Sequence, residues 1–148
     1  MKIIKTLFVI VWMSVIFMFS NQPSNESSKL SDGLILKTVR IIEKINHKQY
    51  SDEEILKKFV KPVRKMAHFT IYLILGILVF CAIDEYNIKN ILVVSILICF
   101  LYSLTDEIHQ LFVVGRSGSL IDCLIDLTGS SLGIIILSIK RRNKNEEV

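Results

Sequence analysis

The stretch ILVVSILICFLYSLTDEIHQ, residues 91–110, decides the fold of this chain. Its uninterrupted apolar part ends at Leu104 and is short, because a helix needs about 20 residues to cross roughly 30 Å of hydrocarbon. A membrane-spanning helix must therefore continue through Asp106, Glu107 and His109. The sequence predicts that these ionisable side chains lie in the outer turns of a transmembrane helix and not in a free loop.

Three further apolar segments predict three more spans. They cover residues 3–20, 66–83 and 120–139, and the stretch quoted above gives a span over residues 90–110. Hydrophobic residues make up 51% of the 148 residues and 22% are charged, with the charges segregated from the apolar blocks. We therefore expect one all-α domain over residues 1–148, a polytopic membrane protein built as a four-transmembrane-helix bundle.

The polar segment 21–65, between the first two predicted spans, has a helical pattern of its own. Apolar residues recur at helical spacing within residues 34–45, which is typical of an amphipathic helix in the membrane interface. The sequence SDEE at residues 51–54 resembles a capping box and predicts a second short helix through Val60. Pro62 then stands just before the second span, where a missing N–H costs least. A solvated linker is the alternative.

Composition and motifs exclude several classes of protein. The net charge of +4 is modest, and the sequence contains no P-loop, GxSxG, HExxH or nucleic-acid-binding motif, so we expect no nucleic-acid partner. No CxxC pair occurs, which argues against a disulfide framework or a zinc ribbon. We predict no cofactor and no metal, and we expect three small core residues at Cys81, Cys99 and Cys123.

The distribution of basic residues indicates the orientation in the membrane. Four spans put both termini on one side, and Lys2, Lys5 and the basic residues in 140–144 lie close to span ends. The other side has more basic residues in raw count, in segment 21–65 and at Arg116, but that segment also carries acids and can translocate despite its charge. We therefore predict cytoplasmic termini.

Conspicuous polar groups then gather at the outer ends of the spans. A charge at the bilayer centre costs roughly 2.5–3.5 kcal/mol on insertion scales, so such residues indicate a functional site by default. The candidates for catalysis are His68, Asp106, Glu107 and His109. The candidates for ligand binding are Asn21, Gln22, Arg64, Lys65, Gln110, Arg116, Asp122 and Asp126.

Three glycines predict where helices approach closely. Gly76 shares a face of the second span with His68, and Gly129 and Gly133 form a GxxxG pattern in the fourth span. Such a pattern permits close helix approach in lipid. We expect the fourth span to pack centrally, with its acids directed toward the outer polar groups.

Two motifs carry a resemblance to a known family. The motif RKxAHFxxYxxxG covers residues 64–76, and DExHQxFxxGR covers residues 106–116. With Asn21-Gln22 before them and Asp122, Asp126, Gly129 and Gly133 after them, the order resembles the VanZ-like family. That family takes its name from a protein associated with low-level resistance to teicoplanin. The resemblance therefore implies a multi-pass protein of the bacterial cell membrane and envelope, with a contribution to glycopeptide resistance as an expectation.

Two hypotheses of function remain open on this sequence. In the first, the polar groups bind or modify an anionic membrane lipid or a lipid-linked wall precursor. Arg64 and Arg116 would then hold the anion, and His68 or His109 would act as a general base. In the second, the protein is a non-catalytic scaffold whose charged residues clamp helices or bind a partner. Whether it is an enzyme, and whether it forms a homo-oligomer, stays open.

Transport and metal binding are weaker alternatives. Polar groups in a transporter usually mark a pathway that reaches the bilayer midplane, whereas here they stop in the outer part of the spans. A metal site could use Asp106 and His109, three residues apart, together with His68. Such clusters are more often hydrogen-bond networks, which is the interpretation we prefer.

Overall fold

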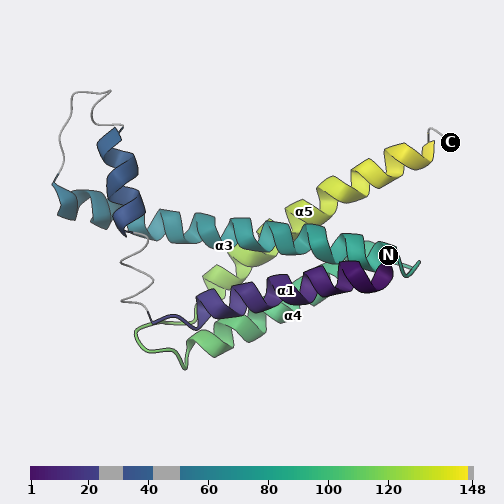
Figure 1. Cartoon of the computed structure of the whole chain (residues 1–148), viewed down its shortest axis with the longest axis horizontal. Coiled ribbons are helices and arrows are strands. Elements are labelled where there is room, and N and C mark those ends of the chain that lie inside the picture. The colour runs from purple at the N-terminus through teal and green to yellow at the C-terminus, as the bar shows by residue number, and fades with distance from the viewer. Residues whose placement is uncertain (24–31, 42–50, 147–148) are drawn as a thin grey trace.

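The computed structural model describes residues 1–23, 32–41 and 51–146, and these ranges contain five helices (Figure 1). Four are long and apolar enough to cross a membrane. They are α1 (Lys2–Ser20), α3 (Asp52–Asp84), α4 (Ile91–Gln110) and α5 (Leu120–Glu146), and the fifth is a short helix over residues 32–41. The predicted all-α architecture with four spans is confirmed.

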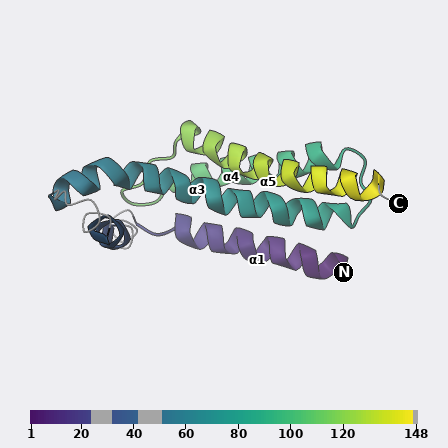
Figure 2. The same cartoon turned by 90° about the horizontal axis from the view of Figure 1, so that it is seen from above.

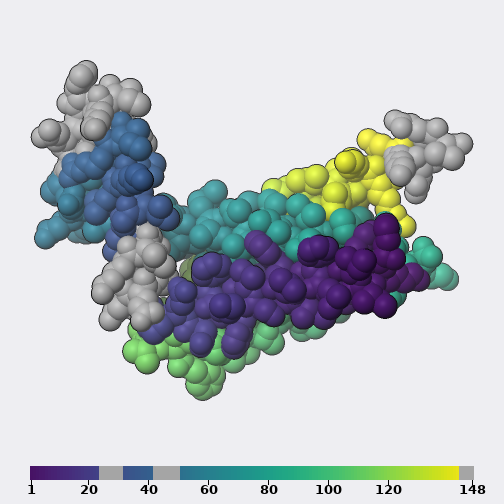
Figure 3. All heavy atoms as spheres, viewed as in Figure 1, coloured from purple at the N-terminus to yellow at the C-terminus, as the bar shows by residue number. Residues whose placement is uncertain are grey.

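The helix α3 is the centre of the bundle, because it contacts α1, α4 and α5. α1, α3 and α4 run along the long axis of the molecule, and α5 crosses α3 obliquely (Figures 1 and 2). In the space-filling view α1 lies across the front of the bundle, and the last turns of α5 project beyond it (Figure 3). The two termini lie toward the same end of the bundle.

The start of α3 confirms the capping box. The Ser51 side chain accepts a hydrogen bond from the backbone N–H of Glu54 at 3.3 Å, and the Glu54 carboxylate accepts one from the Ser51 N–H at 3.1 Å. Asp52 and Glu53 add negative charge to the first turn, which favours the positive end of the helix dipole. These interactions fix the first residue of α3.

The prediction of a separate short helix ending at Val60 was wrong. α3 continues without a break from Asp52 to Asp84, so Pro62 lies inside the helix and not before a new one. Proline removes one helical hydrogen bond, to the carbonyl four residues earlier. Here that carbonyl belongs to Lys58, in an exposed turn where polar surroundings can bind it. The second span is therefore the continuation of a helix that begins at Asp52, well before the apolar stretch.

The segment between α1 and α3 contains a short helix, as predicted. It covers residues 32–41 and lies beside the start of α3 (Figure 2), where Arg40 forms an ion pair with Asp52. Ile35 is buried, whereas Leu34 is 69% exposed and available to a membrane interface. The continuation of the amphipathic pattern to residue 45 falls outside the described residues.

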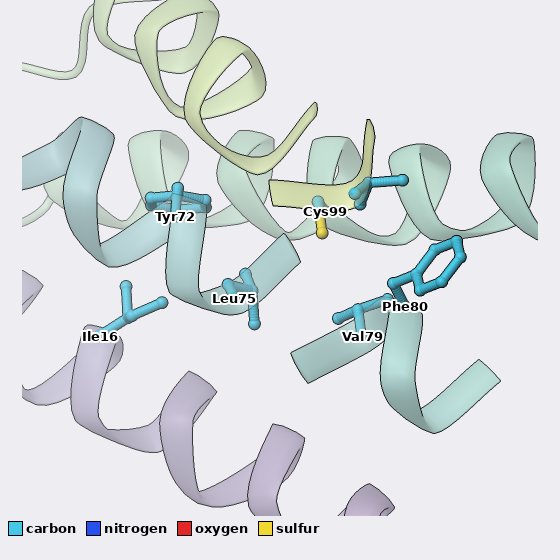
Figure 4. Packing of buried hydrophobic residues seen from close by; sticks show 7 residues of the cluster. Ile16, Tyr72, Leu75, Val79, Phe80 and Cys99 are labelled. Atoms are coloured by element: carbon cyan, nitrogen blue, oxygen red, sulfur yellow. The ribbon is translucent and has the colours of Figure 1, made fainter. Parts of the chain in front are cut away.

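The apolar core joins three of the spans to α5. Its buried members, drawn as sticks in Figure 4, are Ile16, Tyr72, Leu75, Val79, Phe80, Cys99 and Ile134. Two polar groups reach across helices at its edge: Trp12 Nε1 donates to the Ile71 carbonyl at 2.9 Å, and Tyr102 OH donates to the Met13 carbonyl at 2.5 Å. Because both donors are hydrogen-bonded, the two side chains can lie within a hydrocarbon environment.

The contact between α3 and α5 depends on residues without a side chain. A Cβ atom added to Gly129 would lie 2.3 Å from the carbonyl oxygen of Phe69, and one added to Gly133 would lie 2.5 Å from that of Leu73. On the facing helix, a Cβ on Gly76 would lie 2.2 Å from the Ser130 carbonyl oxygen. The backbones of the two helices thus touch, as small residues permit in membrane proteins.

Ion pairs join the helices at the end of the bundle that holds the termini. Lys5 Nζ lies 2.5 Å from Glu85 Oε1, and Arg141 lies 2.9 Å from Asp84 Oδ1. The hydrogen bond from the Lys5 ammonium lowers the pKa of Glu85 below its ordinary value. Because these groups are solvent-accessible, each pair contributes little to stability.

Candidate functional site

The predicted site residues lie at the other end of the bundle, which we call the polar end. The helices alternate in direction, so the C-terminal ends of α1 and α4 meet the N-terminal parts of α5 and of the spanning portion of α3 (Figures 1 and 2). This antiparallel order brings together residues up to 97 positions apart in the sequence. The arrangement is the same whichever side of the membrane the polar end faces.

A cluster of one histidine and two acids occupies the inside of the polar end. We call His68, Glu107 and Asp126 the acid–histidine cluster. His68 Nδ1 lies 3.2 Å from Asp126 Oδ1, and the Ser103 hydroxyl donates to Asp126 Oδ2 at 2.9 Å. Asp126 is fully buried and Glu107 is 4% exposed. One ligand-type atom from each of the three side chains lies within 4.8 Å of the other two.

The loop before α5 reaches Glu107 from the opposite side. The backbone N–H of Ser119 donates to Glu107 Oε2 at 2.7 Å. Gly118 makes this approach possible, because a Cβ at that position would lie 2.4 Å from the Glu107 carbonyl oxygen. The second carboxylate oxygen, Oε1, is buried and accepts no hydrogen bond from the described part of the chain. Glu107 is thus held by one oxygen and leaves the other without a protein partner.

A second buried network surrounds Asp106. Tyr72 OH donates to Asp106 Oδ2 at 3.3 Å, and Gln110 Nε2 lies 3.4 Å from the same oxygen and donates to Ser20 Oγ at 2.9 Å. The network therefore links α3, α4 and α1. The other oxygen, Asp106 Oδ1, is buried without a hydrogen-bond donor among the residues described.

His109 belongs to the outer surface of α4 against α1 and not to the acid–histidine cluster. Its Nε2 atom lies 3.3 Å from Asn21 Oδ1, and its ring lies 4.6 Å from that of Phe17, centre to centre. The ligand-type atoms that converge are thus those of His68, Glu107 and Asp126. This set differs from the combination of His68, Asp106 and His109 that the sequence suggested.

Arg116 caps the end of α1. Its Nε atom donates to the Gln22 carbonyl oxygen at 2.9 Å, and Nη2 donates to the Phe19 carbonyl oxygen at 2.8 Å. Phe19 lies in the last turn of α1, where carbonyls lack intrahelical partners, and Gln22 follows the helix directly after its cap Asn21. Burial, and then the nearby guanidinium of Arg64, lower the pKa of Arg116 from its ordinary value. Gln22 thus takes part through its backbone carbonyl. Arg64 is half-buried and brings a second positive charge close to Arg116.

Replacing Arg116 should loosen the end of α1. We expect Arg116→Ala to cost about 1–2 kcal/mol of unfolding free energy, because two charge-assisted hydrogen bonds to half-exposed carbonyls are lost. Hydrogen exchange of the backbone amides at the end of α1 should accelerate about tenfold for each 1.4 kcal/mol lost locally. The matched control is Arg141→Ala, which removes an exposed ion pair at the other end. Equal, small effects of both changes would contradict the capping role.

The remaining predicted residues lie on the rim of the polar end. Lys65 is exposed on α3, near His68, and Asp122 is half-buried in the first turn of α5. The sequence did not identify Ser20, Ser119 or Gly118 as members of the site. Helical spacing was the available signal for two other hydroxyls, because Tyr72 lies one turn after His68 and Ser103 one turn before Asp106.

Comparison with known proteins gives one family. The model of the VanZ/LLP1 family matches residues 5–141, which include all four candidate spans almost completely and every residue of the acid–histidine cluster. No curated protein and no solved structure matches the chain.

Proposed function

We propose, since the chain belongs to the VanZ/LLP1 family of polytopic membrane proteins, that its polar end binds the anionic headgroup of a membrane lipid or lipid-linked wall precursor. The polar end would face the outside of a bacterial cell membrane. The observation that carries the proposal is that two positive groups, Arg64 and Arg116, lie close together at the rim, near the half-buried His68 and its acids.

The two guanidinium groups favour an anion between or beside them. They lie close enough for the charge of Arg64 to contribute, after burial, to the lowered pKa of Arg116. A phosphate would relieve this repulsion, and the planar fork of arginine donors matches phosphate geometry. Lys65 is exposed beside them and adds positive charge. Lipid phosphates lie at the level where membrane spans end, so the rim of the polar end would lie at the depth of these phosphates.

His68 is the side chain best placed to act on a bound headgroup. It lies one helical turn from Arg64 on the same face of α3. Asp126 holds its Nδ1 atom, so Nε2 is the nitrogen left to exchange a proton with a ligand. An aspartate that orients a histidine in this way is a common arrangement in general acid–base catalysis. The same arrangement also suits simple hydrogen bonding to a phosphate.

The binding test uses matched pairs of amphiphiles. Purified protein in detergent would be titrated with undecaprenyl phosphate against undecaprenol, and with phosphatidylglycerol against diacylglycerol. We expect tighter binding of the phosphate-bearing member of at least one pair, and an affinity about tenfold weaker for Arg64→Gln. The control is Arg141→Gln at the opposite end. Equal binding within both pairs would contradict the proposal, and the pair that responds identifies the source of the phosphate.

The cellular test addresses reaction and resistance. A deletion strain would be complemented with wild type, Arg64→Gln or His68→Gln, and its lipid extract and its sensitivity to teicoplanin compared. We expect sensitivity to change with deletion and to be restored by wild type alone. Lipids that are the same in deletion and wild-type strains would exclude the enzymatic form.

A fluorescent protein fused to the C-terminus tests the proposed orientation. It should fold and fluoresce if the termini are cytoplasmic.

A scaffold role is the second candidate, and one observation favours it. Arg116, Gln110 and Tyr102 all use hydrogen bonds to tie α1 to the rest of the bundle. If this clamping were the whole role of the polar end, Arg64→Gln would leave lipid binding and teicoplanin sensitivity unchanged. Arg116→Gln alone would then impair function, through the loss of its contacts with α1.

A further inference from the structure

We propose that the acid–histidine cluster, formed by His68, Glu107 and Asp126, binds one divalent metal ion of the Zn²⁺ or Mn²⁺ class. The site would lie between α3, α4 and α5, each of which contributes one ligand. This inference does not depend on lipid binding at the rim, because the metal alone is the ligand.

The distances suit a single ion. Ligand-type atoms of the three side chains lie within 4.8 Å of one another, and His68 Nδ1 is 3.2 Å from Asp126 Oδ1. Two ligands bound tetrahedrally at about 2.0–2.1 Å from Zn²⁺ are themselves about 3.3 Å apart. The histidine–aspartate separation already matches this value. Glu107 needs a small side-chain movement to complete the set.

Neighbouring groups orient both carboxylates in the way that metal ligands require. The Ser103 hydroxyl binds Asp126 Oδ2, which leaves Oδ1 on the side of His68. The Ser119 N–H binds Glu107 Oε2, which leaves Oε1 buried without a donor from the residues described. Metal-binding carboxylates are typically fixed by such hydrogen bonds to the oxygen that does not ligate. Glu107 thus has one oxygen without a donor from the described residues, and Asp126 has one oxygen that contacts His68, a hydrogen bond that a bound ion would replace.

The charge of the site also favours a cation. Glu107 and Asp126 are almost completely buried, and Asp106, with its own unpartnered oxygen, is a third buried acid nearby. Their basic neighbours are the His68 imidazole and the Arg116 guanidinium, which interacts with Asp106 and Glu107, so three acids face two basic groups. Buried carboxylates without compensation cost several kcal/mol each. A bound divalent ion would offset that cost and would become the largest local charge.

The donor types narrow the choice of metal. One imidazole nitrogen and two carboxylate oxygens suit Zn²⁺ or Mn²⁺ better than Ca²⁺ or Mg²⁺, which prefer oxygen ligands only. Three protein ligands leave at least one position for water or for an oxygen of a ligand.

The test measures metal directly on the full chain in detergent. After removal of any affinity tag and treatment with EDTA, the protein would be incubated with ZnCl₂ or MnCl₂, desalted, and analysed for metal content and for thermal unfolding by Trp12 fluorescence. We expect about one ion per chain and a rise in the melting temperature with metal, as for any ligand that binds only the folded state. Wild-type protein without bound metal would overturn the proposal regardless of the variants.

Variants locate the ion. His68→Gln, Glu107→Gln and Asp126→Asn should each lose most of the bound metal and of the metal-dependent rise in melting temperature. Asp84→Asn, at the opposite end, should retain both, and so should His109→Gln, because His109 contacts Asn21 and Phe17 instead. Retention of metal by all three cluster variants would overturn the assignment, as would its loss in Asp84→Asn. Loss of the metal in His109→Gln together with its retention in Glu107→Gln would also overturn the assignment.

Discussion

Gly129→Ala is expected to destabilise the protein by about 3 kcal/mol, in the upper part of the usual range for overpacking. The added Cβ would lie 2.3 Å from the carbonyl oxygen of Phe69, and a backbone atom has no rotamer with which to move away. α5 would therefore have to separate from α3 along the whole contact that Gly76, Gly129 and Gly133 permit. The measurement is thermal unfolding of purified protein in detergent.

Gly33→Ala is the matched control for this change. A Cβ at Gly33 meets nothing within 4 Å, and Gly33 lies in the short helix 32–41, where alanine is favoured over glycine by up to about 1 kcal/mol. We expect an unchanged or slightly higher melting temperature. If Gly129→Ala were as harmless as Gly33→Ala, the close contact of α3 with α5 would be incorrect.

His68→Ala is expected to cost about 3–5 kcal/mol in metal-free protein, because it leaves a fully buried carboxylate without its partner. Among the residues that the structure describes, Ser103 would then be the remaining hydrogen-bond donor to Asp126. The double variant His68→Ala/Asp126→Asn should be less destabilised than the sum of the two single changes, by about 0.5–3 kcal/mol. Unfolding would be followed in EDTA, so that bound metal does not contribute.

The control for this cycle is His109→Ala. His109 contacts a neutral amide and an aromatic ring, so its removal leaves no buried charge behind, and we expect a loss of about 1 kcal/mol. Strict additivity of the His68 and Asp126 changes would show that the two side chains do not interact. Similar losses for His68→Ala and His109→Ala would lead to the same conclusion.

The two expected results are linked through the geometry of α3 and α5. His68 lies one residue before Phe69, whose carbonyl Gly129 contacts, and Asp126 lies one helical turn before Gly129. The close approach of the two backbones therefore sets the distance between the histidine and the aspartate. Gly129→Ala should consequently weaken metal binding as well as stability, whereas Gly33→Ala should change neither.

Hydropathy and periodicity were sufficient to predict the architecture. Spans follow from the length of apolar runs, and the polar residues at their ends follow from the need of the segment 91–110 to reach across the hydrocarbon. Helix direction alternates along the chain, so the sequence also determined that His68, Asp106 and Asp126 lie toward one end. The capping box at Ser51 could also be predicted from the sequence, because it involves only neighbouring residues.

The partners of those residues depended on the packing between helices. His109 had an acid, Asp106, within reach by helical spacing, yet α4 turns His109 toward Asn21, while α3 turns His68 toward Asp126 on another helix. Arg116 reaches the carbonyls at the end of α1, and α3 passes through Pro62. Rotation of each helix about its own axis is set by side-chain and glycine contacts with its neighbours, and these contacts are not encoded in local spacing. The sequence by itself thus determined the spans and the end at which the ionisable residues gather, and only the tertiary structure decided which of them meet.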